Sequence, residues 1–316
     1  MIWIAVAVAL AATALSGGRP IAFAAWLLPM PVALFLGARL GDLLRLVGVR
    51  KRIARQNLAQ AFPDKSDAER EAILRAFYRH LGTLIVEFLR APYLSERAIR
   101  ELVEVDWESY RRFEAERAAR GGAIVATAHF GNFELLGSFF ARIGLPLTAI
   151  TKALPKNVFN RFWLDQRRRA GLREVPDSGS LRAILEVLRR GETLAVMIDQ
   201  NMIPRRAVFA PFFGRLAATT PAPAVLAERT GVPVYLVVLH RLPRGRHRVR
   251  IEGPIPFARS GDPAADRLAF TARLNQALEA QIREAPHLWY WIHRRWKTRP
   301  PEEAEDAAGL APAGGS

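Results

Sequence analysis

The amino-acid sequence predicts an α/β protein: a mixed sheet flanked by helices, preceded by an N-terminal helical membrane anchor. The chain opens with uncharged apolar residues, and residues 66–90 show the spacing of an amphipathic helix. After residue 120, short apolar runs alternate with helical patterns, as is typical of α/β architecture. We divide the chain into four segments: 1–48 membrane-associating hydrophobic and amphipathic helices, 49–100 a helical lead-in, 101–300 an α/β domain and 301–316 a disordered tail.

Residues 1–15 are apolar and uncharged. As a helix they would reach roughly 22 Å at about 1.5 Å per residue, which is less than the ~30 Å hydrocarbon core of a bilayer. They could anchor the chain shallowly or form part of a tilted, extended span. A cleaved signal peptide is the alternative, although a positively charged start is missing and Gly17, Gly18, Arg19 and Pro20 follow almost directly.

A second apolar stretch, residues 21–36, is interrupted by Pro29 and Pro31. Apolar residues followed by basic ones are typical of a helix that lies in the membrane interface. The alternative is a core helix hairpin with a solvated basic end. The basic residues that follow are Arg39, Arg45, Arg50, Lys51, Arg52 and Arg55.

Residues 66–90 form the clearest helical pattern. Ser66 followed three residues later by Glu69 indicates a capped start, and apolar residues then recur at helical spacing. The apolar positions are Ile73, Phe77, Leu81, Ile85 and Leu89.

The charge balance indicates an anionic partner. The formal net charge is +16, with 46 Lys and Arg residues spread along the chain. Zinc-ligand spacing, an RNA-binding aromatic signature and a basic-leucine pattern are all missing, so we expect no nucleic-acid partner. Anionic lipid headgroups and acidic proteins fit the charge equally well.

Several catalytic chemistries lose their usual markers. The chain has no cysteine, which excludes disulfides, thiolate metal sites and cysteine nucleophiles. It also has no GxSxG elbow, no HExxH and no glycine-rich phosphate loop. Direct attack by a substrate hydroxyl, with a histidine as general base, remains.

The segment 129–134 (HFGNFE) is the main candidate for such chemistry, because it follows the strand-like residues 123–128 and precedes a helical pattern. His129 would lie at the strand exit and Glu134 in the first helical turn, where its carboxylate could fix the imidazole tautomer. Asn132 could cap the helix, and Gly131 could let the backbone approach a ligand. Alternatively, His129 ends a strand and Glu134 complements the helix dipole.

Four ordered blocks resemble the lipid A biosynthesis acyltransferase family over most of the chain. They are KRIARQNLAQAFP from residue 51, ATAHFGNFELLG at 126–137, the segment 198–234, and WYWIHRRWKTRP at 289–300. The resemblance implies a glycerolipid-acyltransferase-like fold for residues 101–300, with His129 and Glu134 as the catalytic dyad. Glycerolipid acyltransferases usually carry Asp at the second position, so Glu134 favours the lipid A branch.

The resemblance also implies a functional arginine after the dyad and an aspartate at the end of a later strand, which correspond to Arg167 and Asp199. Arg167 could bind a phosphate or stabilise the oxyanion, as backbone amides could, or it could belong to a solvated basic face together with Arg168 and Arg169. Asp199 could order the site or cap its strand. Arg215 precedes a predicted helix start near Thr220 that could face a phosphate or be an ordinary N-terminus.

The aromatic block near the C-terminus has two interpretations. Trp289, Trp291 and Trp296 alternate with basic residues, as in an interfacial or base-stacking patch. Within the family block, they are more often core residues that support a basic surface.

The function implied is transfer of a fatty acyl group from acyl-carrier protein to a hydroxyl of a lipid A precursor or related glycolipid. It would take place at the cytoplasmic face of a bacterial inner membrane containing anionic lipids, with no metal or other cofactor. One rival is an acyltransferase for another lipid, such as a phosphoinositide mannoside or an aminolipid. The other is a non-catalytic basic membrane-binding protein.

Overall fold

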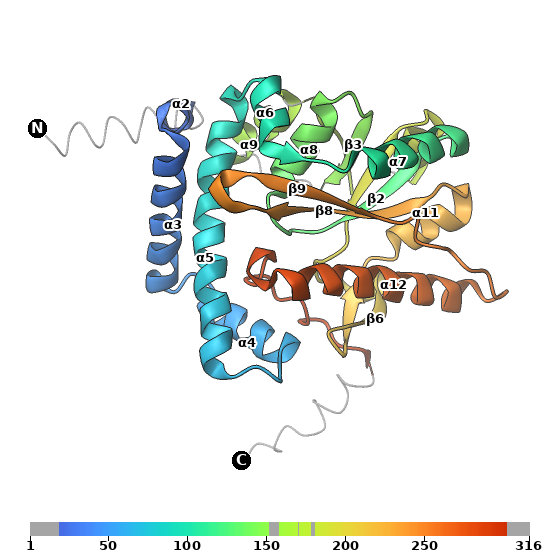
Figure 1. The fold of residues 1–316 in the computed structure, drawn as a ribbon. Helices are drawn as coiled ribbons and strands as arrows, with labels where there is room; N and C mark the ends of the chain where they lie inside the picture. Colours follow the sequence, from blue (N-terminus) through green and yellow to red (C-terminus); the bar gives the residue numbers. More distant parts are fainter. Residues whose placement is uncertain (1–18, 152–157, 170, 178–180, 302–316) are drawn as a thin grey trace, which may run out of the picture.

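A computed structural model describes residues 19–151, 158–169, 171–177 and 181–301 (Figure 1). The expectations for residues 1–15 and for the C-terminal tail from residue 302 lie outside these residues. The strands are β1 (Val103–Glu104), β2 (Ala123–Thr127), β3 (Leu147–Thr151), β4 (Arg173–Pro176), β5 (Thr193–Met197), β6 (Val208–Phe212), β7 (Arg215–Thr219), β8 (Val234–Arg241) and β9 (His247–Glu252).

Seven strands form one mostly parallel sheet in the order β1-β9-β8-β2-β5-β3-β4. The exception is the antiparallel pairing of β8 with β9, so the sheet is mixed, as predicted. The central strand β2 pairs in parallel with β5 on one side and β8 on the other. The carboxyl ends of β2 and β5 therefore meet at the same edge, where open α/β sheets place their chemistry.

Helices cover both faces of this sheet (Figure 1). The helices are α2 (Arg19–Leu27), α3 (Met30–Val47), α4 (Lys51–Ala61), α5 (Asp67–Arg90), α6 (Glu96–Leu102), α7 (Trp107–Arg120), α8 (Phe133–Arg142), α9 (Val158–Arg169), α10 (Leu181–Arg189), α11 (Ala222–Thr230) and α12 (Pro263–Glu284), with short 3-10 turns η1 (Ala91–Tyr93), η2 (Pro204–Arg206), η3 (Pro243–Gly245) and η4 (Pro286–Leu288).

Alternating residues of β2 enter two different cores. Val125 packs with α6, α7 and α8, whereas Ile124 packs with α10, α11 and α12.

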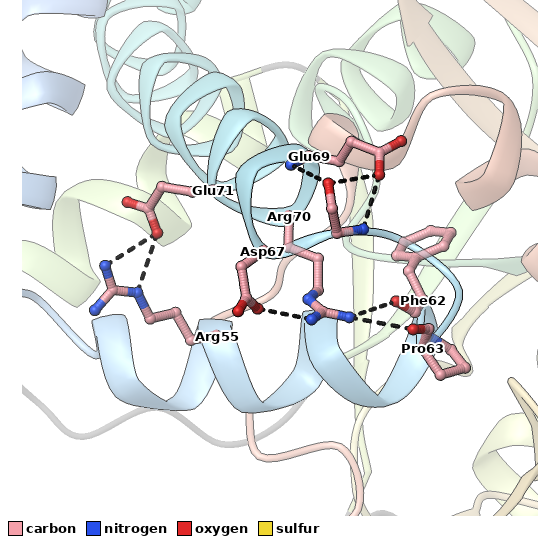
Figure 2. Close-up of polar contacts among 8 residues, drawn as sticks. Arg55, Phe62, Pro63, Asp67, Glu69, Arg70 and Glu71 are labelled. Atoms are coloured by element: carbon pink, nitrogen blue, oxygen red, sulfur yellow. Dashed lines mark hydrogen bonds and ion pairs between the residues drawn. The ribbon is translucent and has the colours of Figure 1, made fainter.

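The helical first hundred residues share a core with the sheet. Leu58 of α4 and Leu74 of α5 belong to the same buried cluster as Leu236 of β8 and Trp291. Figure 1 shows α5 between α3 and the sheet. The predicted capped start of α5 is confirmed, because the Ser66 side chain accepts from the Glu69 amide and the Glu69 carboxylate accepts from the Ser66 amide (Figure 2).

A salt bridge joins α4 to α5. Nε and Nη2 of Arg55 donate to Oε2 of Glu71 at 3.1 and 3.0 Å (Figure 2). Arg70 binds Asp67 and the carbonyls of Phe62 and Pro63, which fixes the turn between the two helices (Figure 2). Helix α4 is thus held to α5 by these polar contacts at the surface as well as by the shared core.

The interruption predicted at Pro29 separates α2 from α3, since Pro29 is the N-cap of α3. Helix α3 then packs closely on α5 through glycines: a Cβ on Gly41 would lie 2.0 Å from the Tyr78 carbonyl oxygen, and one on Gly82 would lie 2.1 Å from that of Gly37. None of the helices in residues 19–301, so far as they are described, is long and apolar enough to cross a bilayer. Exposed apolar side chains nevertheless gather on α2 and α3: Ile21, Phe23, Trp26, Leu27, Val32, Phe35, Leu36, Leu43, Leu46 and Val47.

Some elements were not predicted from the sequence. Strands β4 and β9 and helix α12 are not among the predicted elements, and residues 215–219, which precede the predicted helix start near Thr220, form β7. Strand β7 pairs with β6 in a separate antiparallel hairpin. The tryptophans at 289, 291 and 296 are buried, with 1%, 0% and 8% of their surface exposed, which confirms the core interpretation.

Candidate active site

His129 lies directly after β2 and faces the end of β5. Its Nδ1 lies 2.9 Å from Oδ1 of Asp199, and its backbone amide donates to Oδ2 of the same carboxylate at 3.0 Å. Asp199 is 3% exposed, whereas the His129 side chain is 20% exposed. The partner of the His129 imidazole is therefore Asp199, not Glu134 as the spacing had suggested, because parallel pairing of β2 and β5 brings the two strand ends together.

The charges of this pair support a defined tautomer. Burial raises the pKa of Asp199, but the charge and hydrogen bonds of His129 and a hydrogen bond from Trp289 outweigh it and hold that pKa below its usual value. An anionic Asp199 accepts a hydrogen bond from Nδ1–H of His129. The neutral imidazole therefore carries its proton on Nδ1, and Nε2 is the atom that can act as a base. Nε2 lies 3.2 Å from Nε2 of Gln200, which can donate to it. Burial lowers the pKa of His129, yet the charge and hydrogen bond of Asp199 raise it overall.

The C-terminal block holds Asp199 from the other side. Trp289 Nε1 donates to Oδ2 of Asp199 at 2.9 Å, and the Tyr290 amide donates to the His129 carbonyl at 3.1 Å. The backbone amide of Asn201 donates to Nε2 of His293 at 3.0 Å. Burial lowers the pKa of His293 to about 4, so this imidazole stays neutral near pH 7.

Glu134 forms an ion-pair cluster with Arg167. Nε and Nη2 of Arg167 donate to the two carboxylate oxygens of Glu134 at 3.0 and 2.6 Å, and Nη1 donates to Glu174 on β4 at 2.9 Å. Burial lowers the pKa of Arg167, but both carboxylates raise it above its usual value. The structure thus distinguishes Arg167 from Arg168 and Arg169, which are exposed.

Gly131 and Asn132 shape the turn between β2 and α8. Gly131 has a φ of 58°, and a Cβ there would lie 1.7 Å from the Leu239 carbonyl oxygen, so its close approach is to β8. Asn132 caps α8 as predicted, since its Oδ1 accepts from the Leu135 amide at 2.9 Å. Its Nδ2 donates to Oε2 of the buried Glu87 on α5 at 2.8 Å.

The backbone amides of the motif are already engaged. The His129 amide donates to Asp199, the Phe130 amide to the Ala128 carbonyl at 2.7 Å and the Gly131 amide to the Leu288 carbonyl at 2.9 Å. The expected role of backbone amides in binding an oxyanion therefore does not fall to these three groups. Two side chains also carry N–H donors near this edge of the sheet: Arg167 lines the cavity described below, and Gln200 lies beside Nε2 of His129.

Arg215 lies outside this network. It is an exposed residue at the start of β7, and its Nη1 donates to Oε1 of Gln60 on α4 at 2.8 Å. The predicted helix start at Thr220 is an ordinary one, because the Thr220 hydroxyl accepts from the Ala222 amide at 3.3 Å. Among the described residues, no three His, Asp or Glu side chains converge as metal ligands would.

A mostly apolar cavity of about 80 Å³, which opens to solvent, runs between α8 and the sheet. Glu134 and Arg167 line it, and so does Phe133, whose ring lies 4.9 Å from that of His129, centroid to centroid. The remaining lining is apolar and includes small residues such as Gly137 and Ala195. The site therefore combines a part-buried histidine paired with a buried aspartate, a part-buried cation and an apolar cavity.

Sequence reasoning missed Gln200 and Trp289 as site residues and gave Asp199 no firm role. The signal for Asp199 and Gln200 was their place directly after a buried strand, at an edge that parallel strands share. Trp289 carries no comparable signal, because its contact with Asp199 joins residues 90 positions apart.

Comparisons with known proteins identify the family of the chain. A family model for bacterial lipid A biosynthesis acyltransferases matches residues 18–298. The chain is 31% identical over 281 residues to a lipid A biosynthesis palmitoleoyltransferase of Escherichia coli, covering 88% of this chain and 89% of that protein. It is 30% identical to a lauroyltransferase of the same organism, over 86% and 88% of the two chains, and 27% identical to a phosphatidylinositol mannoside acyltransferase of Mycobacterium tuberculosis, over 77% and 76%. The chain belongs to the bacterial lipid A biosynthesis acyltransferase family.

Proposed function

We propose that this protein transfers a fatty acyl group from acyl-carrier protein to a hydroxyl of a lipid A precursor, at the cytoplasmic face of the bacterial inner membrane. The observation that carries the proposal is the His129–Asp199 pair beside an apolar cavity. The similarity to the palmitoleoyltransferase and the lauroyltransferase of lipid A biosynthesis supports the acceptor class.

In the proposed reaction, Nε2 of His129 takes the proton of the acceptor hydroxyl as its oxygen attacks the thioester carbonyl carbon. Asp199 keeps Nδ1 protonated and stabilises the imidazolium that forms. Collapse of the tetrahedral intermediate forms the ester and breaks the carbon–sulfur bond. His129 then returns the proton to the departing thiolate.

Arg167 and Gln200 are the proposed donors to the oxyanion. Gln200 lies beside Nε2 of His129, and Arg167 lines the cavity. A hydrogen-bond donor directed at the developing negative charge stabilises the transition state most where water is excluded. Glu134 then acts through Arg167, whose guanidinium it holds by two hydrogen bonds. The acyl chain occupies the apolar cavity, since a hydrocarbon tail stabilises its complex by leaving water.

Membrane association is proposed to use α2 and α3. Their exposed apolar side chains include Leu27, Phe35, Leu46 and Val47, which are 61%, 60%, 82% and 72% exposed. Together with the net charge of +16, such a face suits the interface of an anionic bilayer.

The test is transfer from radiolabelled acyl-carrier protein to a panel of bacterial lipids in detergent. We expect transfer to a lipid A precursor, reduced about a hundredfold or more in His129→Ala. Preferential transfer to a phosphatidylinositol mannoside would instead favour the activity named for the mycobacterial relative. Turnover that His129→Ala leaves unchanged, or no turnover with any lipid, would refute the catalytic assignment.

A further inference from the structure

A basic hollow lies between α5 and η4, outside the proposed catalytic network. It has a volume of about 370 Å³ and opens to solvent. In the part of the chain that the structure describes, its lining has no acidic side chain; it includes three arginines, which supply the positive charge, and two histidines whose pKa is lowered by burial. They are Arg75, Arg79, His80, Arg241 and His287.

Carboxylates behind the hollow hold two of its guanidinium groups in place. Arg241 donates to both oxygens of the buried Glu87, each at 2.6 Å, and its Nε donates to Nδ1 of His80 at 3.0 Å. Arg79 donates to Oδ1 of Asp42 on α3 at 2.9 Å. These groups are thus ordered before any ligand arrives, which lowers the entropic cost of binding.

Arg75 supplies charge that these pairs do not neutralise. Within residues 19–301, so far as they are described, it has no hydrogen-bond or ion-pair partner, and it is exposed at the hollow. Guanidinium groups that converge on one hollow suit a phosphate, whose oxygens accept several charge-assisted hydrogen bonds.

The position of the hollow indicates where such a phosphate would come from. Arg79 reaches Asp42 on α3, and the next residue, Leu43, is 54% exposed, followed one turn later by the 82% exposed Leu46. Apolar side chains beside a phosphate-binding hollow match the boundary between acyl chains and headgroups.

We propose that this hollow binds the phosphate group of an anionic membrane lipid, at a site separate from the His129 centre. The inference rests on the membrane association in the proposed function, not on acyl transfer. A chain of hydrogen bonds from Arg241 through Glu87 to Asn132 joins the hollow to the cap of α8.

The experiment is flotation of the full chain with phosphatidylcholine vesicles that contain phosphatidate or, at equal surface charge, phosphatidylserine. Wild type should prefer phosphatidate, whose phosphate is a sterically open monoester. Arg75→Gln should lose about fivefold in affinity for phosphatidate vesicles, as expected for one arginine near a membrane surface. Arg75→Lys should recover part of that loss.

Two matched variants distinguish binding at the hollow from non-specific electrostatic attraction to the vesicle. Arg111→Gln removes one exposed cation from α7 and should keep the phosphatidate preference. Asp42→Asn loses the ordering of Arg79 but also removes a carboxylate that competes with the ligand for this cation; the two effects should offset, so phosphatidate binding should stay close to that of wild type. An equal loss in Arg111→Gln and Arg75→Gln, or no loss in Arg75→Gln, would overturn the proposal.

Inorganic phosphate distinguishes a lipid headgroup from a free ion. If it binds the detergent-solubilised protein through Arg75 and displaces phosphatidate vesicles at millimolar concentration, the hollow is a free-phosphate site and the assignment to lipid is wrong. The His129→Ala protein should retain the phosphatidate preference. This result keeps failure of the lipid site distinguishable from failure of acyl transfer.

Discussion

At the scale of single residues, the site depends on two carboxylates with different tasks. Asp199 binds the imidazole of His129, whereas Glu134 binds Arg167 through both of its oxygens. The spacing of the motif had assigned the first task to Glu134. The two assignments predict different pH dependence, because only a group that contacts the imidazole changes its tautomer and charge directly.

For Asp199→Asn we expect a loss of at least about a hundredfold in kcat, since Nδ1 is no longer held in its protonated tautomer. His129 must be neutral to accept a proton, so activity should rise with pH through its raised pKa. Removing the carboxylate that raises this pKa should move the acid limb to lower pH. The measurement is kcat/KM against pH, and an acid limb that stays in place would contradict the pairing.

For Glu134→Gln we expect the acid limb to move to lower pH by less than in Asp199→Asn, because Glu134 raises the pKa of His129 through its charge alone, whereas Asp199 also hydrogen-bonds the imidazole. The rate should fall about tenfold to a hundredfold, as Arg167 loses one of the two carboxylates that orient it. Full pH–rate profiles of both variants should be compared. A shift as large as that of Asp199→Asn would restore Glu134 as the partner of His129.

At the scale of secondary-structure elements, α8 links the motif to the cavity. Gly137 of α8 lines the cavity, and a Cβ there would lie 3.5 Å from the nearest atom, a methyl group of Leu172. A larger side chain at this position fits the helix but fills the cavity.

Gly137→Leu should therefore shift the preferred donor to a shorter acyl chain, while Gly137→Ala should change it little. The readout is the ratio of transfer rates for a series of acyl-carrier thioesters that differ in chain length. If the leucine variant lowers all rates by the same factor, the cavity does not hold the acyl chain.

The packing of α3 on α5 depends on small residues. Gly41→Val would place carbon atoms within the van der Waals radius of the Tyr78 backbone, so the helices must separate. We expect a loss of stability of about 1–3 kcal/mol, typical of overpacking. Thermal unfolding in detergent measures it, with the exposed Leu43→Val as control. Unchanged unfolding of Gly41→Val would show that α3 does not pack as described.

At the scale of the whole molecule, a formal charge of +16 should affect encounters with the acidic carrier protein that we propose as the acyl donor. Long-range attraction of this kind is screened over about 10 Å at 0.1 M salt. We expect KM for the acyl-carrier substrate to rise several-fold between low and physiological ionic strength, with kcat nearly unchanged. The control is a short acyl-thioester that lacks the carrier, whose KM should be insensitive to salt.

The sequence by itself determined the α/β class, the start of α5 at its capping box, the break at Pro29 and the cap of α8 by Asn132. These features depend on local rules, in which a side chain bonds a backbone group a few residues away. The resemblance of four blocks also identified the family and directed attention to His129, Glu134, Arg167 and Asp199.

Only the tertiary structure decided which of these groups pair. Asp199 reaches His129 across 70 residues because β2 and β5 are parallel neighbours, and Trp289 reaches Asp199 across 90. Strand order follows from how apolar faces pack, and a single sequence does not specify it residue by residue. The basic hollow on α5 likewise takes its residues from α5, β8 and η4, whose proximity exists only in the folded chain.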